Sequence, residues 1–201
     1  MATIRAAGPA DVAHLRTVCA LAYRDNPLMR WVLPDAATRD DACAAWLGPA
    51  LERYLAAGRV DVLTAADDVV AVAAWRVPGL DPAGTAAAAT LPQPAGVLRA
   101  LVGRARAAEV LAALAGSAGL APAVPGPYLN YLAVHPDRQG RGHGGELLRH
   151  GLDALAGAAG TPWLGTTDAR NVPFYERHGF VVAGSYDLAP HGPALAVLHR
   201  P

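Results

Sequence analysis

Lysine is absent from this chain of 201 residues, and cysteine, methionine and phenylalanine occur only twice each. Without lysine, a phosphate-binding loop of the Gly-x-x-x-x-Gly-Lys-Ser/Thr type is excluded. The two cysteines, Cys19 and Cys43, fall in helical patterns and are interpreted as small core residues.

The chain also has no excess of positive or negative charge. The chain has 17 basic and 17 acidic residues, which argues against a nucleic-acid-binding surface. No stretch free of charges and prolines reaches the ~18 residues that a membrane span requires, and no signal peptide is evident. With 53% hydrophobic residues, the sequence predicts a single domain over residues 1–201, located in the cytoplasm, without a membrane or nucleic-acid partner.

Metal-ligand spacing is missing as well. None of the dispersed histidines, for example His14, His150, His178 and His199, is spaced from a carboxylate or cysteine as zinc ligands are. We therefore expect no metal site.

The most informative stretch is residues 128–152. An apolar, β-favouring run, Tyr128 to Val134, predicts a buried strand, and His135-Pro136 ends it because proline cannot donate to a sheet. A glycine-rich turn follows. Leu147, Leu148, Leu152 and Leu155 then recur at helical spacing and indicate an amphipathic helix with Gly151 on its apolar face.

This order of strand, glycine loop and helix suits an anion. The first N–H groups of a helix lack internal partners and lie at the positive end of its dipole. Glycines let the main chain approach a phosphate closely, and Arg138 and Arg141 add positive charge. The loop is therefore predicted to bind a phosphate group, most simply a diphosphate.

Two known kinds of diphosphate-binding loop have patterns similar to this one. The dinucleotide pattern Gly-x-Gly-x-x-Gly fits residues 140–145 in register, but the acidic residue that should follow roughly 20 positions later has no good candidate. The segment Leu-Ala-Val-His-Pro-Asp-Arg-Gln-Gly-Arg-Gly-His-Gly instead resembles the acetyl-coenzyme A loop of the GNAT superfamily of N-acetyltransferases. The signature Gln/Arg-x-x-Gly-x-Gly/Ala is matched by Gln139, Gly142 and Gly144, and the preceding Leu-x-Val-x-Pro by Leu132, Val134 and Pro136.

A second segment carries the same resemblance. The closing motif of the family, Tyr-x-x-x-Gly-Phe, is matched by Tyr175, Gly179 and Phe180. The two motifs occur in the family's order and at about its separation. One departure concerns the asparagine that many members carry seven residues before the tyrosine. Asn171 lies four residues before Tyr175, and Asp168 holds the earlier position.

The resemblance implies an α/β (α+β) fold. We expect a twisted, mixed and mostly antiparallel sheet of about seven strands, splayed between the fourth and fifth, with helices on both faces. From the residues, we expect strands over 3–6, 60–64, 69–75, 128–134, 162–167, 180–183 and 194–198, and helices over 12–23 and 39–57, the second kinked or divided at Pro49.

Two segments stay open to interpretation. Residues 25–34 are irregular, with a proline near each end, and they either line the acceptor side of the cleft or form an apolar plug over the core. Residues 78–127 are predicted to be an enlarged insertion of loops and one long helix, over about 97–114. It serves as a lid or wall beside the acceptor site, or as an oligomer surface, and both a monomer and a homodimer are compatible with the sequence.

The resemblance also implies a site for acetyl-CoA. The loop amides would hold its diphosphate, and the central strand would hold its pantetheine arm and thioester. The segment just before the helix that carries Tyr175 would contact the arm from the other side. The residues so implied are Leu132, Ala133, Val134, Arg138, Gln139, Gly140, Arg141, Gly142, His143, Gly144, Gly145 and Asn171.

Tyr175 is the candidate general acid. A phenol has a pKa near ~10, so it is protonated at neutral pH and can donate to a departing thiolate. No general base is assigned, because the central strand has no carboxylate. Asn130, Asp25, His135 and His191 are the nearest alternatives, and each is more simply a surface or turn residue.

Three functions are compatible with these features. The leading one is acetyl-CoA-dependent acetylation of a primary amine of a small molecule, by direct attack in a ternary complex. The second is acetylation of a protein N-terminus or lysine. The third is a non-catalytic acyl-CoA-binding sensor, against which the intact Tyr175 argues.

Overall fold

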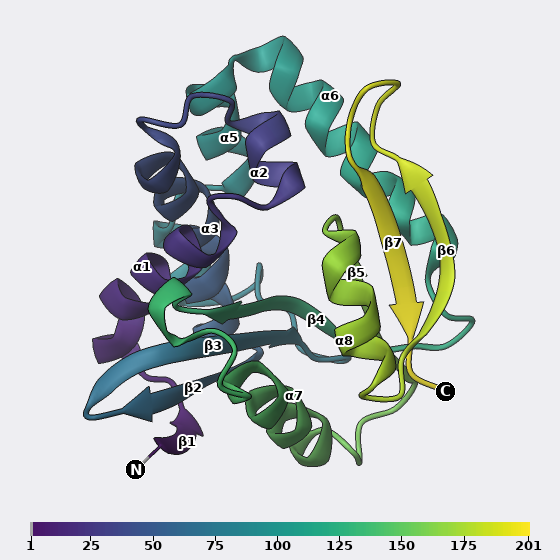
Figure 1. Cartoon of the computed structure of the whole chain (residues 1–201). Coiled ribbons are helices and arrows are strands. Elements are labelled where there is room, and N and C mark those ends of the chain that lie inside the picture. Colours follow the sequence, from purple (N-terminus) through teal and green to yellow (C-terminus); the bar gives the residue numbers. More distant parts are fainter. Residues whose placement is uncertain (1) are drawn as a thin grey trace.

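Seven strands form one sheet in the order β1-β2-β3-β4-β5-β7-β6 (Figure 1). The computed structural model describes residues 2–201, with the backbone alone for residue 87. The strands are β1 (Ala2–Ala6), β2 (Arg59–Ala65), β3 (Asp68–Arg76), β4 (Pro125–Val134), β5 (Thr161–Thr166), β6 (Val181–Asp187) and β7 (Ala194–His199). Neighbouring strands are antiparallel except β4 and β5, which run parallel. The expected mixed, mostly antiparallel sheet is confirmed.

Helices cover both faces of this sheet. The helices are α1 (Val12–Tyr23), α2 (Pro27–Val32), α3 (Arg39–Ala56), α4 (Ala86–Thr90), α5 (Pro94–Val102), α6 (Arg104–Ala115), α7 (His143–Ala154) and α8 (Val172–Glu176). Short 3-10 turns are η1 (Pro9–Asp11), η2 (Gly116–Leu120), η3 (Pro136–Arg138) and η4 (Ala169–Asn171).

Two main apolar clusters lie on opposite faces. On one face, α1, α2, α3, α5 and α6 pack against Val62, Val72 and Ala133. On the other, α7 and α8 pack against side chains such as Leu63 and Trp75. The prediction that Gly151 lies on the apolar face of its helix is confirmed, because a Cβ there would approach Trp75 Nε1 to 2.5 Å.

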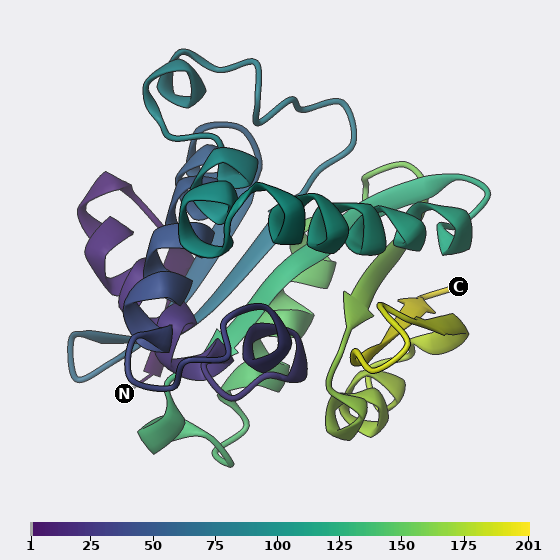
Figure 2. The same ribbon diagram turned by 90° about the horizontal axis from the view of Figure 1, so that it is seen from above.

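The insertion, residues 78–127, connects the two halves of the molecule. Leu98, Ala107 and Val110 pack into the cluster of α1 and α3, whereas Ala113 and Leu114 pack against β5, β6 and β7. The Tyr186 hydroxyl of β6 donates to the Ala113 carbonyl at 2.9 Å. In Figure 2, α6 can be followed from the α3 layer across toward the C-terminal strands.

Several predicted boundaries were wrong. The single long helix over about 97–114 is divided into α5 and α6 at Gly103, whose φ of +80° lies in the left-handed region. By contrast, α3 is one helix through Pro49 and is not divided there, and the Arg53 guanidinium donates to the Pro49 carbonyl at 3.0 Å. Residues 27–32, expected to be irregular, form α2.

Candidate functional site

The sheet opens between its two parallel strands. Residue pairs between β4 and β5 end at Leu129–Leu164, so β4 continues to Val134 without a strand neighbour on that side. The predicted splay between the fourth and fifth strands is confirmed. A strand edge of this kind presents unpaired N–H and C=O groups to a ligand.

A bulge in β4 lies at the start of this free edge. Ala74 pairs with Tyr131 and Trp75 with Leu129, so Asn130 is the extra residue. The bulge exchanges the two faces of the strand: Leu129 and Leu132 both contact the α7 cluster, whereas Tyr131 belongs with α1 and α3. Bulges of this type bend a strand and redirect its side chains.

A cavity of about 760 Å³ occupies this opening. It is bounded by the end of α1, the free edge of β4, the glycine loop, and the segment from Asp168 to α8. Its lining residues are Leu21, Ala22, Tyr23, Asp25, Asn26, Leu132, Ala133, Val134, Pro136, Arg138, Gln139, Gly140, Gly142, His143, Gly144, Gly145, Asp168, Arg170, Asn171, Phe174 and Arg177.

The glycine loop has a geometry that only glycine adopts easily. Gly140 and Gly142 have φ values of +73° and +86°, and Gly142 is the N-cap of α7. A Cβ at either position would meet no atom within 4 Å, so their backbone faces open space. The Gln139 amide donates to the Val134 carbonyl at 3.1 Å and joins the loop to the strand. The N-terminus of a twelve-residue helix thus opens into the cavity.

The arginines around the loop differ in whether a carboxylate already pairs with them. Arg138 and Arg177 line the cavity. Arg170 lines it too, but its guanidinium is paired with Asp168 at 2.7 Å, which holds the pKa of that carboxyl below its ordinary value. Arg138 and Arg177 are therefore the better candidates to attract a diphosphate.

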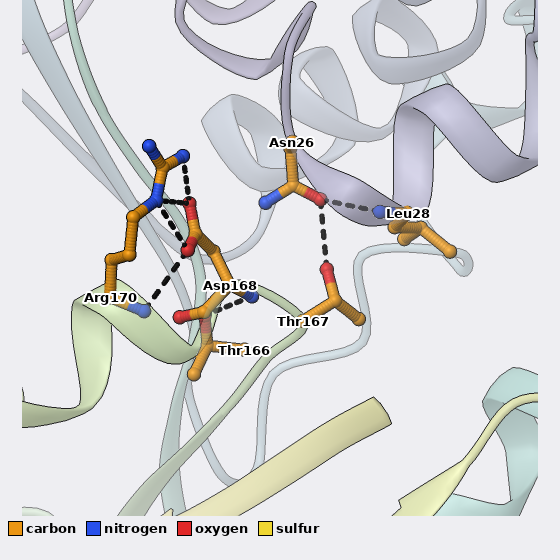
Figure 3. Close-up of polar contacts among 6 residues, drawn as sticks. All are labelled: Asn26, Leu28, Thr166, Thr167, Asp168 and Arg170. Atoms are coloured by element: carbon orange, nitrogen blue, oxygen red, sulfur yellow. Dashed lines mark hydrogen bonds and ion pairs between the residues drawn. The ribbon is translucent and has the colours of Figure 1, made fainter. Parts of the chain in front are cut away.

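The two walls of the opening are joined by polar contacts at one end (Figure 3). Asn26 Oδ1 accepts from Leu28 N at 2.9 Å and so caps α2, and it also accepts from Thr167 Oγ1 at 2.8 Å. Asp168 in turn accepts from Arg170 N at 3.0 Å and caps the turn before α8. Asn26 thus links the α1–α2 connection to the end of β5.

Residues 25–34 contribute both to the cavity lining and to the core. Asp25 and Asn26 line the cavity, whereas Met29 and Val32 are buried in the core. Trp31 lies against the insertion: the Arg106 guanidinium stacks over its ring at 4.0 Å and donates to its carbonyl at 3.0 Å.

The residues expected to bind the coenzyme converge in one place. All of them line the cavity except Arg141, which is exposed beside it. Asn171 lies at the N-cap position of α8 and faces the cavity opposite β4.

Tyr175 does not line the cavity. It is 8% exposed and packs edge-on against Phe174 and Phe180, at centroid distances of 5.1 and 5.9 Å. Burial raises the pKa of its hydroxyl, so the phenol stays protonated well above neutral pH. This protonation state suits a proton donor.

Tyr23 lines the cavity, but no sequence motif marks it as a site residue. Its hydroxyl lies 3.1 Å from Leu132 N, although 109 positions separate the two residues in the chain. The sequence places a tyrosine at the end of a helix, and no local motif relates that position to the central strand.

The alternatives for a general base are dispersed. Asp25 lines the cavity, and its side chain is 74% exposed. His135 caps a turn by accepting from Asp137 N at 3.3 Å, and His191 is exposed between β6 and β7. Asn130 is the bulged residue of β4. The geometry singles out no base among them.

Residues 2–201 contain no group of metal ligands and no membrane-spanning helix. No group of three His, Cys, Asp or Glu side chains in this range could hold a metal ion. None of the helices described in this range is long and apolar enough to cross a membrane.

Residues 101–182 match a family model described as an acetyltransferase (GNAT) domain. The matched range contains the insertion helix α6, the free edge of β4, the glycine loop and Tyr175. The family match and the cavity therefore concern the same part of the chain.

Solved structures share the whole fold. One, a histone acetyltransferase HPA2 and related acetyltransferase from Corynebacterium glutamicum, is 24% identical with a TM-score of 0.73, and the match covers 100% of this chain and 96% of that one. The ribosomal-protein-S18-alanine N-acetyltransferase of Escherichia coli is 21% identical with a TM-score of 0.57, over 100% and 94% of the two chains. A GNAT family acetyltransferase from Brucella melitensis, solved in complex with acetyl-CoA, is 20% identical with a TM-score of 0.50, over 98% and 88%.

Proposed function

We propose that this chain, whose residues 101–182 match an acetyltransferase (GNAT) domain, transfers an acetyl group from acetyl-CoA to a primary amine of a small molecule. The amine attacks the thioester directly, while both substrates are bound. The observation that carries this proposal is the cavity itself, which joins the glycine loop at the N-terminus of α7 to the free edge of β4.

The cavity offers a separate place to each part of the coenzyme. The diphosphate would lie at the loop from Arg138 to Gly145, where helix N–H groups and positive charge meet. The pantetheine arm would run along Leu132, Ala133 and Val134, with Asn171 on the opposite wall. The thioester then reaches the inner end of the cavity, where β4 diverges from β5.

The chemistry needs an oxyanion site and a proton donor. When the amine attacks, negative charge develops on the thioester oxygen, and backbone N–H groups of the free β4 edge can stabilise it. The carbon–sulfur bond then breaks and the thiolate takes a proton. Tyr175 is proposed as the donor of that proton, because its ring packs against Phe174 of the cavity lining and its hydroxyl is protonated at neutral pH. The amine nitrogen loses its extra proton to solvent or to a base that remains unassigned.

The balanced charge of the chain and the apolar, proline-framed segment 25–34 favour a small acceptor. Arg106 of α6 holds Trp31 of that segment, which also contributes Asp25 and Asn26 to the cavity lining. Acetylation of a protein N-terminus or lysine is a second candidate, because one of the similar structures is a ribosomal-protein-S18-alanine N-acetyltransferase.

The test has two steps. Calorimetry should detect acetyl-CoA binding, and a panel of polyamines, amino sugars, amino-acid derivatives and short peptides should then be scanned for thiol release. Release with a small amine supports the proposal, and release with peptides alone supports the second candidate. Binding without release from any amine indicates an acyl-CoA sensor. No binding contradicts all three.

A further inference from the structure

Tyr23, the last residue of α1, occupies the free edge of β4. Its hydroxyl accepts from Leu132 N at 3.1 Å and lies 3.4 Å from the Leu132 carbonyl, to which it donates. Leu132 lies beyond the last β4–β5 residue pair, so these are peptide groups that no strand satisfies on that side. A single hydroxyl thus takes the place of both missing sheet partners.

Neighbouring aromatic rings hold the ring of Tyr23 in position for its hydrogen bonds to Leu132. It packs edge-on against Tyr131 at a centroid distance of 6.1 Å, and Tyr131 packs in the same way against Tyr54 at 6.3 Å. Burial raises the pKa of the Tyr23 hydroxyl well above its ordinary value, and the nearby Tyr175 raises it further. The phenol is therefore protonated at neutral pH and can donate and accept at once.

The same two peptide groups are those that an extended amide arm requires. An amide carbonyl can accept from Leu132 N–H, and an amide N–H can donate to Leu132 C=O, as a neighbouring strand would. A ligand that enters along β4 must therefore displace the Tyr23 hydroxyl. An arm without amides would displace the Tyr23 hydroxyl without replacing its hydrogen bonds. The Leu132 N–H and C=O would then be unpaired, which costs free energy.

We propose that Tyr23 is a positioning residue that keeps the Leu132 peptide groups hydrogen-bonded until a donor binds, and that yields them only to an acyl donor with an amide-bearing arm. The inference rests on the proposed function, because it assumes that a coenzyme A thioester enters this cavity. It adds that the α1 tyrosine competes with the donor and thereby restricts which donors bind.

The test compares Tyr23→Phe with wild type by calorimetry, using two ligands. Coenzyme A carries the amide arm, whereas 3′-phosphoadenosine 5′-diphosphate carries only the nucleotide part that meets the glycine loop. Since a neutral hydrogen bond contributes about 1 kcal/mol, Tyr23→Phe should bind coenzyme A roughly 3- to 10-fold more tightly. Its affinity for the nucleotide fragment should be unchanged.

Tyr54→Phe is the matched control, because Tyr54 belongs to the same row of rings and has no hydrogen bond to Leu132 among the described contacts. It should bind both ligands as wild type does. Equal or weaker coenzyme A binding by Tyr23→Phe, with normal fragment binding, would overturn the role of Tyr23 and leave the proposed function intact. Failure of wild type to bind either ligand would overturn both.

A measurement on wild type alone provides a second check. In nuclear magnetic resonance spectra, coenzyme A should shift the Tyr23 ring and the Leu132 amide, and the nucleotide fragment should shift neither. If coenzyme A leaves the Tyr23 ring unchanged while it shifts the glycine loop, the hydroxyl is not displaced and the inference fails.

Discussion

At the scale of single residues, Gly142 shows most clearly how sequence determines the cavity. Its φ of +86° gives α7 a left-handed N-cap, and the space beside its Cα is open toward the cavity. Gly79, in the insertion, has nearly the same φ of +83° and equally open surroundings, but it is remote from the cavity lining. The two glycines thus share a backbone requirement and differ in what they face.

Gly142→Ala should weaken coenzyme A binding by at least tenfold, whereas Gly79→Ala should leave it unchanged. Both substitutions should lower the free energy of unfolding by about 1 kcal/mol, because a Cβ is strained at a left-handed φ. Calorimetry and urea unfolding of both variants separate the two effects. Equal coenzyme affinity in the two variants would contradict the phosphate-binding role of the loop.

Tyr175→Phe tests the proposed proton donor. Loss of the hydroxyl should lower kcat by about 10²-fold or more, in line with general acid catalysis, and should leave the Kd for acetyl-CoA nearly unchanged. The ring contacts with Phe174 and Phe180 remain, so the fold should be preserved. A parallel decline in coenzyme affinity and stability, with kcat unaffected, would identify Tyr175 as a core residue.

At the scale of elements, Asn26 joins the start of α2 to the end of β5. Asn26→Ala removes the cap on Leu28 N and the bond to Thr167 Oγ1, so it should lower the free energy of unfolding by about 1–2 kcal/mol. Thr167→Val removes only the hydrogen bond to Asn26, so it should lower the free energy of unfolding by about half as much. Chemical denaturation measures both. Equal losses would show that the cap on α2 contributes nothing.

Several elements could be predicted from local sequence because one rule governs each of them. Short apolar, β-favouring runs indicated β2 and β3 to within about a residue, and leucines at helical spacing indicated α7. The signal for α2 was present but unused, since Asn26-Pro27 is a favoured N-cap followed by proline at the first helical position.

Other features depended on tertiary contacts. Apolar spacing continues through Gly103, and the break between α5 and α6 follows from its backbone and from packing on two different clusters. Pro125 is the first residue of β4 and Pro127 lies inside it, where the register with β5 is irregular and a missing N–H is tolerated. The bulge at Asn130 requires a partner strand, so residues 128–134 alone could not indicate it.

At the scale of the whole molecule, the motif residues of the glycine loop, β4 and α8 account for one side of the cavity, and distant residues complete it. Most of the residues proposed to bind the coenzyme lie within residues 132–145 and could be named from one stretch of sequence. Tyr23, Asn26 and Phe174 come from α1, the α1–α2 connection and α8. Only the folded sheet brings Tyr23 to Leu132.

Acid stability is another property of the folded molecule. Asp11 accepts from Arg5 at 2.7 and 2.8 Å, which lowers the pKa of its carboxyl from 3.8 to about 2. Because the pKa is lower in the folded state, the stabilisation is complete above about pH 4 and is lost as the pH falls toward 2. Since Arg5 is partly exposed, the expected contribution is about 1 kcal/mol.

Asp11→Asn should therefore reduce the free energy of unfolding at pH 7 and lessen its decline between about pH 4 and pH 2. Exposed Asp67, which Asn can replace at its left-handed φ of +68°, provides the control variant Asp67→Asn with an unchanged acid profile. Urea unfolding at several pH values measures both. Identical acid profiles for the two variants would contradict the role of the Arg5–Asp11 pair.

The most direct measurement is acetyl-CoA binding by calorimetry, followed in the same sample by amine addition with detection of free thiol. We predict saturable binding and thiol release with a small primary amine. Binding should be weakened in Gly142→Ala and retained in Tyr175→Phe, in which release should be slow. Absence of acetyl-CoA binding by the folded wild-type protein would contradict the proposal that this cavity serves acetyl transfer.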